Sequence, residues 1–312
     1  MRLGVFVSAF ALAVGTASAE PLSVPFDFSN AALGLDVAID GKPLYMILDT
    51  GVDPSAIDIA RAEALGIKVD RAAGGEASGE GDDKEAKIYP APMTGLSIAG
   101  RGFAPFDALA MDMSALSKGY RRQLDGVLGY SFLAGRAILI DYPQSRLEIL
   151  DAPVQAWPSV ATCRKRWSAP LKNFGDDTIP IIDGFRFGAA SGPISLDTGS
   201  NGGITLYQGA LDLPGVKAAL VETGERTATG ARGTTKIKTY VLNQAVGFGP
   251  FGLPAGQAVA LRPAKGAPEP RMANIGNKLF AAMGLKMLLD YRGRVMTFYG
   301  DCGPRRRQKN SR

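Results

Sequence analysis

Two short segments of the chain carry the same three residues in a setting that could bring carboxylates together. Asp49-Thr50-Gly51 follows the apolar pair Ile47-Leu48, and Asp197-Thr198-Gly199 follows Ser195-Leu196. Asp and Gly are ordinary turn residues, so one such triplet is a weak sign of a site. Two copies 148 positions apart (197 − 49) indicate instead a duplicated unit, in which each half supplies one carboxylate to a shared site.

The sequence downstream of the two triplets keeps the same frame. A Gly-Val-Leu-Gly run ends at Gly129, 80 positions after Asp49, and an Asn-Ile-Gly run ends at Gly276, 79 positions after Asp197. An Asp-Tyr pair follows in both halves, after 12 further positions in the first and 14 in the second. Two unrelated turns would not share this spacing, which therefore supports the duplication.

The absence of histidine narrows the chemistry that the chain can perform. Ser-His-Asp and Cys-His catalysis are excluded, and so are zinc sites that depend on histidine. Carboxylates remain as the leading acid and base groups. The aspartates of the two triplets are therefore the first candidates for catalysis.

Apolar patterns predict the elements that carry the first triplet. Residues 33–39 alternate as a half-buried strand, and after a turn residues 44–48 form an apolar strand that ends at Asp49. Residues 55–67 have helical composition. Residues 70–88 are rich in glycine and charged residues, which predicts an exposed loop or hairpin.

The second half repeats this order of elements. Residues 178–182 and 194–196 predict two strands around an Asp183-Gly184 turn, and the second strand leads into Asp197. Residues 223–235 predict a second polar hairpin. Between the halves, residues 152–170 contain several prolines and have the composition of a linker.

The beginning of the chain has the features of an export signal. Residues 1–19 combine a charged start, a short apolar run and a small-residue cleavage pattern before Glu20. An uncleaved anchor is the alternative, but the apolar run is short for a membrane span of roughly 20 residues. We therefore expect an exported protein, periplasmic or secreted, with no membrane span after signal removal.

The basic composition belongs to the tail at residues 304–312. The formal net charge of the chain is +5, and this tail holds five Lys or Arg residues and no acidic residue. The rest of the chain is close to neutral, so composition gives no indication of a nucleic-acid groove. The tail is expected to be a solvated end, with contact to an anionic surface as the minor alternative.

Length and cysteines suggest how the mature chain is organised. About 290 residues follow the signal, a comfortable length for two lobes, which we place at 20–155 and 178–303 with a linker at 156–177. Cys163 and Cys302 flank the second half and are compatible with one disulfide in an oxidising compartment. Two free buried thiols are the alternative.

On these motifs the chain resembles the pepsin and retropepsin superfamily of aspartic peptidases, and within it the exported bacterial retropepsin-like proteins. The resemblance covers both halves, residues 33–151 and 178–300. In that family each Asp-Thr-Gly has a later apolar-apolar-Gly element that passes beside it. The resemblance implies a mainly β, two-lobed pepsin-like acid protease fold, in which each lobe is a small closed β-barrel with short helices.

The resemblance also implies an activity and its residues. Asp49 and Asp197 would be the catalytic dyad of an aspartic endopeptidase, sharing one proton and activating a water against a polypeptide substrate. No metal or cofactor would be required, and two triplets on one chain imply an active monomer. The residues that would support the dyad are Thr50, Gly51, Thr198, Gly199 and Ser200.

Two positions depart from the family pattern. Val52 stands where a small residue, often with a hydroxyl, follows the first triplet, whereas Ser200 fits the second. Val52 leaves Asp49 without a hydroxyl partner, and burial without that partner should raise its affinity for a proton. Asn274 replaces an apolar residue in the second apolar-apolar-Gly element.

Two functions from different classes fit these observations. The first is an active aspartic endopeptidase, supported by the paired carboxylates. The second is a peptide-binding or regulatory envelope protein on the same fold, with weak or lost catalysis, since a fold does not fix a function. Val52 and the short polar hairpins support the second. In a third interpretation the triplets are only structural turns, but this interpretation requires the shared spacing to be a coincidence.

Overall fold

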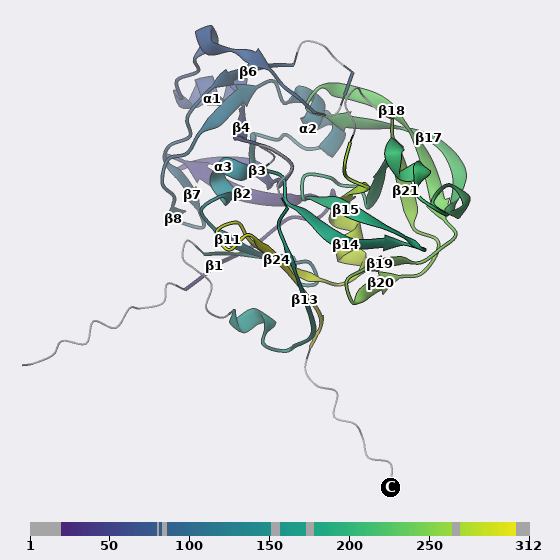
Figure 1. The fold of residues 1–312 in the computed structure, drawn as a ribbon. Helices are drawn as coiled ribbons and strands as arrows, with labels where there is room; N and C mark the ends of the chain where they lie inside the picture. The colour runs from purple at the N-terminus through teal and green to yellow at the C-terminus, as the bar shows by residue number, and fades with distance from the viewer. Residues whose placement is uncertain are drawn as a thin grey trace, which may run out of the picture.

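The computed structural model describes residues 20–79, 81–82, 86–150, 157–172, 178–263 and 269–303. The predicted signal segment and the basic tail lie outside these residues. Within them the chain is mainly β, with a few short helices (Figure 1). No helix in the described part of the chain is long and apolar enough to cross a membrane.

Nine strands of the first half form one sheet, here called the N-terminal sheet. Their order in space is β5-β6-β9-β4-β10-β3-β2-β7-β8. The strands are β2 (Leu33–Ile39), β3 (Lys42–Leu48), β4 (Ser55–Asp58), β5 (Gly75–Glu76), β6 (Lys87–Pro90), β7 (Leu96–Ile98), β8 (Arg101–Gly102), β9 (Ala108–Met111) and β10 (Gly126–Leu128). The helical segments of this half are α1 (Ile59–Leu65), η1 (Arg71–Ala73), α2 (Ser114–Tyr120) and α3 (Tyr130–Leu133).

Nine strands of the second half form the C-terminal sheet, in the order β17-β18-β21-β16-β22-β15-β14-β19-β20. The strands are β14 (Ile181–Phe187), β15 (Ala190–Asp197), β16 (Ile204–Tyr207), β17 (Leu220–Gly230), β18 (Gly233–Leu242), β19 (Val246–Phe248), β20 (Phe251–Leu253), β21 (Ala258–Arg262) and β22 (Ala273–Gly276). The helical segments are η3 (Gln208–Asp212), η4 (Lys217–Ala219) and α4 (Asn277–Ala282).

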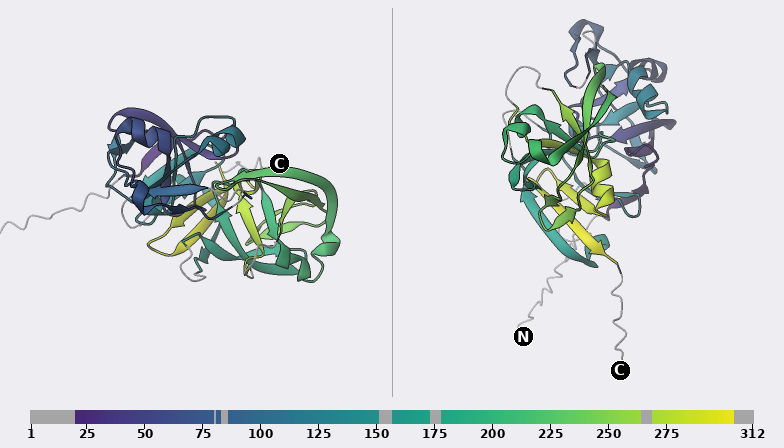
Figure 2. Two further views of the ribbon diagram at one scale, coloured as in Figure 1. Left: turned by 90° about the horizontal axis from the view of Figure 1, so that it is seen from above. Right: turned by 90° about the vertical axis from the view of Figure 1, so that its right-hand side faces the viewer.

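A third sheet is built from both halves. Its order is β1-β12-β11-β23-β24-β13, so that β11 of the first half pairs antiparallel with β23 of the second. Figure 1 shows its strands β1, β11, β13 and β24 in the lower middle of the molecule, and Figure 2 shows the molecule from above and from the right. Its strands are β1 (Leu22–Pro25), β11 (Ala137–Asp141), β12 (Arg146–Leu150), β13 (Cys163–Pro170), β23 (Lys286–Asp290) and β24 (Val295–Cys302), with η2 (Pro158–Val160) before β13.

The two nine-stranded sheets have the same topology, strand for strand. β3 and β15 occupy equivalent places, as do β10 and β22, and the longest hairpin of the second half, β17–β18, is equivalent to β5–β6. The predicted duplication is therefore confirmed by the order of the strands. It is a repeat of one folding unit within one chain.

The expectation of a closed barrel in each half is wrong. Among the described residues, the N-terminal sheet ends at β5 and β8 and the C-terminal sheet at β17 and β20, with no ladder joining the ends. The edge strands β5 and β8 have two residues each, too few for the row of hydrogen bonds that closes a barrel. In the C-terminal sheet the edge strand β17 instead extends with β18 as a long hairpin.

The alternating patterns place the predicted side chains in the core. Leu35, Val37 and Ile39 of β2 are buried, while Asp36 between them is exposed, as period-two alternation requires. One apolar cluster takes in residues of all three sheets, such as Leu35, Phe248 and Met287. The shared core fixes the position of each sheet relative to the others.

Two local predictions differ from the structure. Residues 55–58 form strand β4, and the helix of this segment begins only at Ile59, after Asp58 accepts the backbone N–H of Arg61 as N-cap. The β14–β15 hairpin turns after Phe187, whereas Asp183 and Gly184 form a bulge where the register shifts. At Gly184 the backbone has φ +105°, and the Trp167 ring packs where a side chain would stand.

The expected linker contains a strand of the shared sheet. Within residues 156–177, β13 runs antiparallel to β24, with Cys163 opposite Cys302. These two cysteines form a disulfide, which confirms the predicted bond and ties the two strands together at their ends. Residues 157–172, between the halves, are thus an ordered part of the fold.

Candidate active site

Both aspartates of the triplets stand at the ends of equivalent strands. Asp49 directly follows β3, and Asp197 is the last residue of β15. A parallel strand runs beside each one: β10 pairs with β3, and β22 pairs with β15 up to the register position of Asp197 and Gly276. The predicted passage of an apolar-apolar-Gly element beside each triplet is confirmed by this pairing.

Two glycines, Gly129 directly after β10 and Gly276 at the end of β22, are required by the closeness of the triplet loops. A Cβ on Gly129 would lie 2.5 Å from the carbonyl oxygen of Val52, and a Cβ on Gly276 would lie 2.7 Å from that of Gly202. Backbone atoms cannot move aside as flexible side chains can. Any larger residue at either glycine would push the loop, and with it the aspartate, out of place.

The two triplet loops are locked together by their threonines. The Thr50 hydroxyl donates to the Leu196 carbonyl (2.6 Å) and accepts the Thr198 backbone N–H (3.1 Å). Reciprocally, the Thr198 hydroxyl donates to the Leu48 carbonyl (2.9 Å) and accepts the Thr50 N–H (3.0 Å). Both side chains are buried, so all four hydrogen bonds are shielded from water. The geometry fixes the two loops against each other across the halves of the chain.

The glycines of the triplets allow the two carboxylates to meet. The Gly199 N–H lies within hydrogen-bond distance of Oδ1 of Asp49 (3.1 Å) and of Oδ1 of Asp197 (3.0 Å). A Cβ on Gly199 would lie 2.0 Å from Oδ2 of Asp49, and a Cβ on Gly51 would lie 3.0 Å from Oδ1 of Asp197. One backbone N–H therefore bridges both carboxylates, and no side chain other than hydrogen fits at Gly199.

The hydrogen bonds to the two carboxylates are unequal. Asp197 accepts the backbone N–H of Ser200 (2.9 Å) at Oδ1 and the side-chain amide of Asn274 (2.7 Å) at Oδ2. Apart from the shared Gly199 N–H, Asp49 accepts the Gly51 N–H (2.7 Å). The support that Ser200 gives to Asp197 runs through its backbone N–H, and its hydroxyl accepts the N–H of Gly202.

Burial raises the pKa of Asp49 well above its ordinary value, and the negative charge of Asp197 raises it further. The N–H groups of Gly51 and Gly199 act in the opposite direction but do not cancel the loss of water. The Val52 side chain packs in an apolar cluster with Tyr45 and Tyr120 and offers no hydroxyl. This direction agrees with the expectation from Val52.

Asn274 was visible in the sequence only as a departure from the family pattern. Its side-chain oxygen accepts the Ser195 hydroxyl (2.6 Å), which turns its amide nitrogen toward Asp197. Ser195 is buried on β15, and the register places it directly opposite Asn274 on β22. The polar residue Asn274 within an apolar sequence element was thus the signal that its side chain contacts Asp197.

Two further residues at the site were not found from the sequence. The hydroxyl of Tyr120, the last residue of α2, donates to the carbonyl oxygen of Gly199. Asn277, fully buried at the start of α4, donates to the carbonyls of Thr198 (2.6 Å) and Ala31 (3.0 Å) and accepts the Tyr142 hydroxyl (2.7 Å). Both residues connect the second triplet to the first half of the chain, and no local pattern encodes such contacts.

The β17–β18 hairpin of the second half reaches the first half near the dyad. Ala231, between its strands, packs on the cluster that holds Val52 and Tyr120. A Cβ on Gly81 would lie 2.0 Å from the carbonyl oxygen of Arg232, so the segment between β5 and β6 touches the same hairpin tip. Figure 1 shows the long β17–β18 hairpin arching toward α2. The predicted polar hairpins therefore meet on one side of the site.

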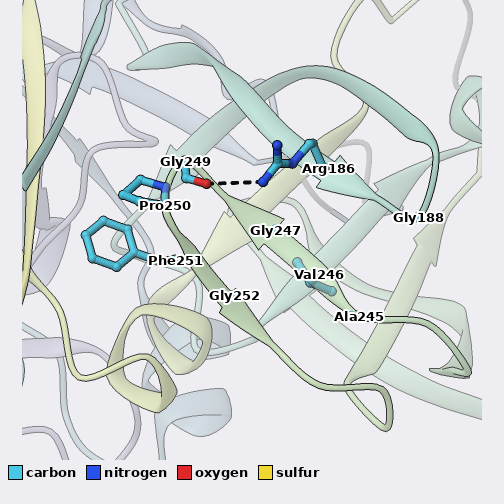
Figure 3. A pocket seen from close by; sticks show the side chains of 9 residues that line it. All are labelled: Arg186, Gly188, Ala245, Val246, Gly247, Gly249, Pro250, Phe251 and Gly252. Carbon is cyan, nitrogen blue, oxygen red and sulfur yellow. Dashed lines mark hydrogen bonds between the residues drawn. The ribbon is translucent and has the colours of Figure 1, made fainter. Parts of the chain in front are cut away.

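A surface groove elsewhere on the C-terminal sheet is separate from the dyad. It lies at β14, β19 and β20, where the Arg186 guanidinium donates to the Gly249 carbonyl (3.3 Å; Figure 3). Its lining is otherwise mostly glycine and apolar residues. In the described part of the chain, no three His, Cys, Asp or Glu side chains gather as metal ligands would.

Two aspartates at the ends of equivalent strands, each beside a parallel strand that leads into a glycine, form the arrangement expected of an aspartic peptidase. Residues 35–132 match the family model described as aspartyl protease, and this stretch holds the first triplet together with β10 and α3. This match supports an aspartic peptidase superfamily for residues 35–132. A comparison with curated proteins found no match.

Proposed function

We propose that the chain is an aspartic endopeptidase in which Asp49 and Asp197 act together on a water and a peptide bond. The observation that carries this proposal is the Gly199 N–H within 3.1 Å of Oδ1 of Asp49 and 3.0 Å of Oδ1 of Asp197. Two carboxylates held so close cannot both ionise at low cost, so they retain one proton between them. The family match of residues 35–132 supports the same reaction class.

The unequal environments assign a role to each aspartate. Asp197, with amide donors on both of its oxygens, is the ionised member and takes a proton from the water as general base. The water oxygen bonds to the peptide carbonyl carbon while protonated Asp49 gives its proton to the carbonyl oxygen. Asp197 then passes the proton it gained to the amide nitrogen, the C–N bond breaks, and Asp49 recovers a proton from the tetrahedral hydroxyl.

The proposal includes the organisation of the mature protein. We assign one lobe to residues 20–155 and one to residues 178–303, joined through residues 156–177 and the shared sheet. Export after cleavage before Glu20 fits the Cys163–Cys302 disulfide, because such bonds persist in oxidising compartments. A mature N-terminus at Glu20, read by mass spectrometry of the exported protein, tests this part. A monomer in solution is expected because both aspartates belong to one chain.

A cleavage assay tests the proposed function. The full chain is incubated with an unfolded protein and with a peptide library between about pH 3 and about pH 8. Asp49→Asn and Asp197→Asn should each abolish cleavage, whereas Asp36→Asn, an aspartate with a 92% exposed side chain on β2, should cleave as the wild type does. Equal cleavage by the wild type and both dyad variants would contradict the assignment.

The second candidate is a peptide-binding or regulatory envelope protein on the same fold. The packing of the hairpin tip residue Ala231 against the Val52 and Tyr120 cluster favours it, since a peptide retained beneath the hairpins need not be cleaved. A statine-type hydroxyl inhibitor separates the two functions. Binding of library peptides without any product, and without binding of the inhibitor, would favour this second function over catalysis.

A further inference from the structure

Tyr120 brings a hydroxyl from the first half of the chain to the second triplet. It ends α2, and its hydroxyl donates to the carbonyl oxygen of Gly199, the residue whose N–H bridges both carboxylates. Its ring is partly buried in the cluster that also contains Val52 and Ala231. The sequence pattern of the family did not single out this residue, and the steps assigned above to Asp49 and Asp197 do not use it.

The peptide group that receives this hydrogen bond also supports Asp197. The Gly199 carbonyl and the Ser200 N–H belong to the same peptide unit, and the Ser200 N–H donates to Oδ1 of Asp197 (2.9 Å). A donor on the carbonyl oxygen polarises the peptide and makes its N–H a stronger donor, by about 10–30% per bond in condensed-phase estimates. The hydroxyl and the carboxylate are thereby joined through one peptide unit.

The hydroxyl is held in place by the packing of α2. Gly119 lies against the β17–β18 hairpin, where an added Cβ would meet the Cβ of Thr229 at 3.3 Å. The backbone N–H of Met113, before the helix, donates to the side chain of Asp58 (3.2 Å). At the other end, Arg121 takes a left-handed conformation with φ 52° and stops the helix directly after Tyr120. Tyr120 is therefore fixed between two parts of the fold.

The raised pKa of Tyr120 keeps its hydroxyl protonated, so that it can always donate a hydrogen bond. Burial raises the pKa of its hydroxyl, and the charges of Asp49 and Asp197 raise it further, with a smaller contribution from Tyr45. The hydroxyl therefore keeps its proton throughout the acidic and neutral range in which a carboxylate pair works. It can donate a hydrogen bond but cannot act as the general base.

We propose that Tyr120 is a positioning residue of the dyad: through the peptide unit of Gly199 and Ser200, its hydroxyl orients the Asp197 carboxylate and stabilises its ionised form. This inference rests on the proposed function for its kinetic consequences. The part of the proposal that links the Tyr120 hydroxyl to the ionisation of Asp197 does not depend on catalysis.

The test is Tyr120→Phe, which removes the hydroxyl and keeps the ring. We expect kcat to fall by about tenfold, which corresponds to about 1.4 kcal/mol of transition-state stabilisation, with KM nearly unchanged. The acidic limb of the pH profile should move to higher pH, because the Asp197 carboxylate loses support for its ionised form. Tyr45→Phe is the matched control: this tyrosine lies in the same cluster but donates to Asp27, and its loss should leave kcat and the limb in place.

A second readout separates this inference from the proposed function. The carboxyl carbon of Asp197, assigned by comparison with Asp197→Asn, is titrated by NMR in the wild type and in Tyr120→Phe. A higher midpoint in the variant supports the inference even where the wild type cleaves nothing and the proposed function fails. An unchanged Asp197 midpoint in Tyr120→Phe, with only a lower melting temperature, would reduce Tyr120 to a structural contact and overturn the proposal.

Discussion

Asn274 donates its side-chain amide to Oδ2 of Asp197 over 2.7 Å and accepts the Ser195 hydroxyl at 2.6 Å. The carboxylate determines which way the Asn274 amide points, because only the amide nitrogen can donate to it, and the Ser195 hydroxyl donates to the amide oxygen on the other side. Asp49 has no equivalent side-chain amide in the described part of the site, where Val127 stands at the corresponding place in β10. The two halves repeat one topology, yet this pair makes the two aspartates chemically unequal.

Replacing Asn274 by leucine tests this relationship. A leucine side chain would restore the apolar character of the family element but remove the hydrogen-bond donor from Asp197. Asn274→Leu should therefore lower kcat/KM by about tenfold or more. This is the effect expected from losing a charge-assisted hydrogen bond of about 1.5–3 kcal/mol. The acidic limb of the pH–rate profile should move to higher pH. Ser195→Ala should act in the same direction but more weakly, and the double variant should lose less than the sum. Additive losses would contradict a relay from Ser195 through Asn274.

Replacing Val52 by serine tests whether the missing hydroxyl beside Asp49 contributes to the difference between the two aspartates. The proposed reaction needs Asp49 protonated, and the pKa of Asp49 is raised mainly by burial and then by the charge of Asp197. A hydroxyl that donates to Asp49 would stabilise its ionised form and lower that pKa. The basic limb of the pH–rate profile should therefore move to lower pH in Val52→Ser. Val52→Ala, which lacks the hydroxyl, is the matched control, and a basic limb that moves equally in both variants would contradict the role of the hydroxyl.

The sequence predicted the parts of the fold and of the site that depend on strict local patterns. Asp-Thr-Gly, the glycine that ends β10 or β22 and the alternation of β2 are such patterns, because a tight loop or a buried face tolerates few residue types. The contacts of Tyr120 and Asn277 depend on how distant elements pack, so single positions carried no signal for them. Whether a sheet closes depends on pairing between its two edge strands, which lie far apart in the sequence, and this is why open sheets replaced the expected barrels.

The pKa of Asp49 also has a consequence for stability. Below about pH 4 both the folded and the unfolded chain hold this proton. As the pH rises above that value the unfolded chain releases it while the folded chain retains it, so the free energy of unfolding falls, by up to about 1.4 kcal/mol per pH unit, until Asp49 ionises in the folded state. Asp49→Asn removes this titration. The variant should therefore gain stability over the wild type as the pH rises from acid to neutral, measured by urea unfolding. Equal stabilities at all pH values would contradict the buried, protonated state.

The lock between the two threonines can be tested without an activity assay. Thr198→Val keeps the shape of the side chain but removes the hydroxyl that donates to Leu48 and accepts from Thr50. Each of the two lost bonds leaves a buried backbone group without its partner, at a cost of about 1–3 kcal/mol, so we expect a loss of about 2–6 kcal/mol in the free energy of unfolding. Thr198→Ser, which keeps the hydroxyl, should retain most of the free energy of unfolding of the wild type. Thr227→Val, on the exposed face of β17, is the control for the substitution itself.

The disulfide provides a prediction that separates stability from the site. Cys163 and Cys302 are 139 positions apart and lie opposite each other on β13 and β24, so the bond closes a loop that contains the whole C-terminal sheet. Restricting so long a loop in the unfolded chain is worth several kcal/mol, and removal of a native disulfide typically costs about 2–5 kcal/mol. The double variant Cys163→Ala, Cys302→Ala should lose this amount of free energy of unfolding, measured by denaturant unfolding.

The kcat and pH profile of the double variant should match the wild type, because β13 still pairs with β24 and both triplet loops are held by Thr50 and Thr198. A fall in kcat without a fall in stability would mean that the disulfide positions the dyad directly.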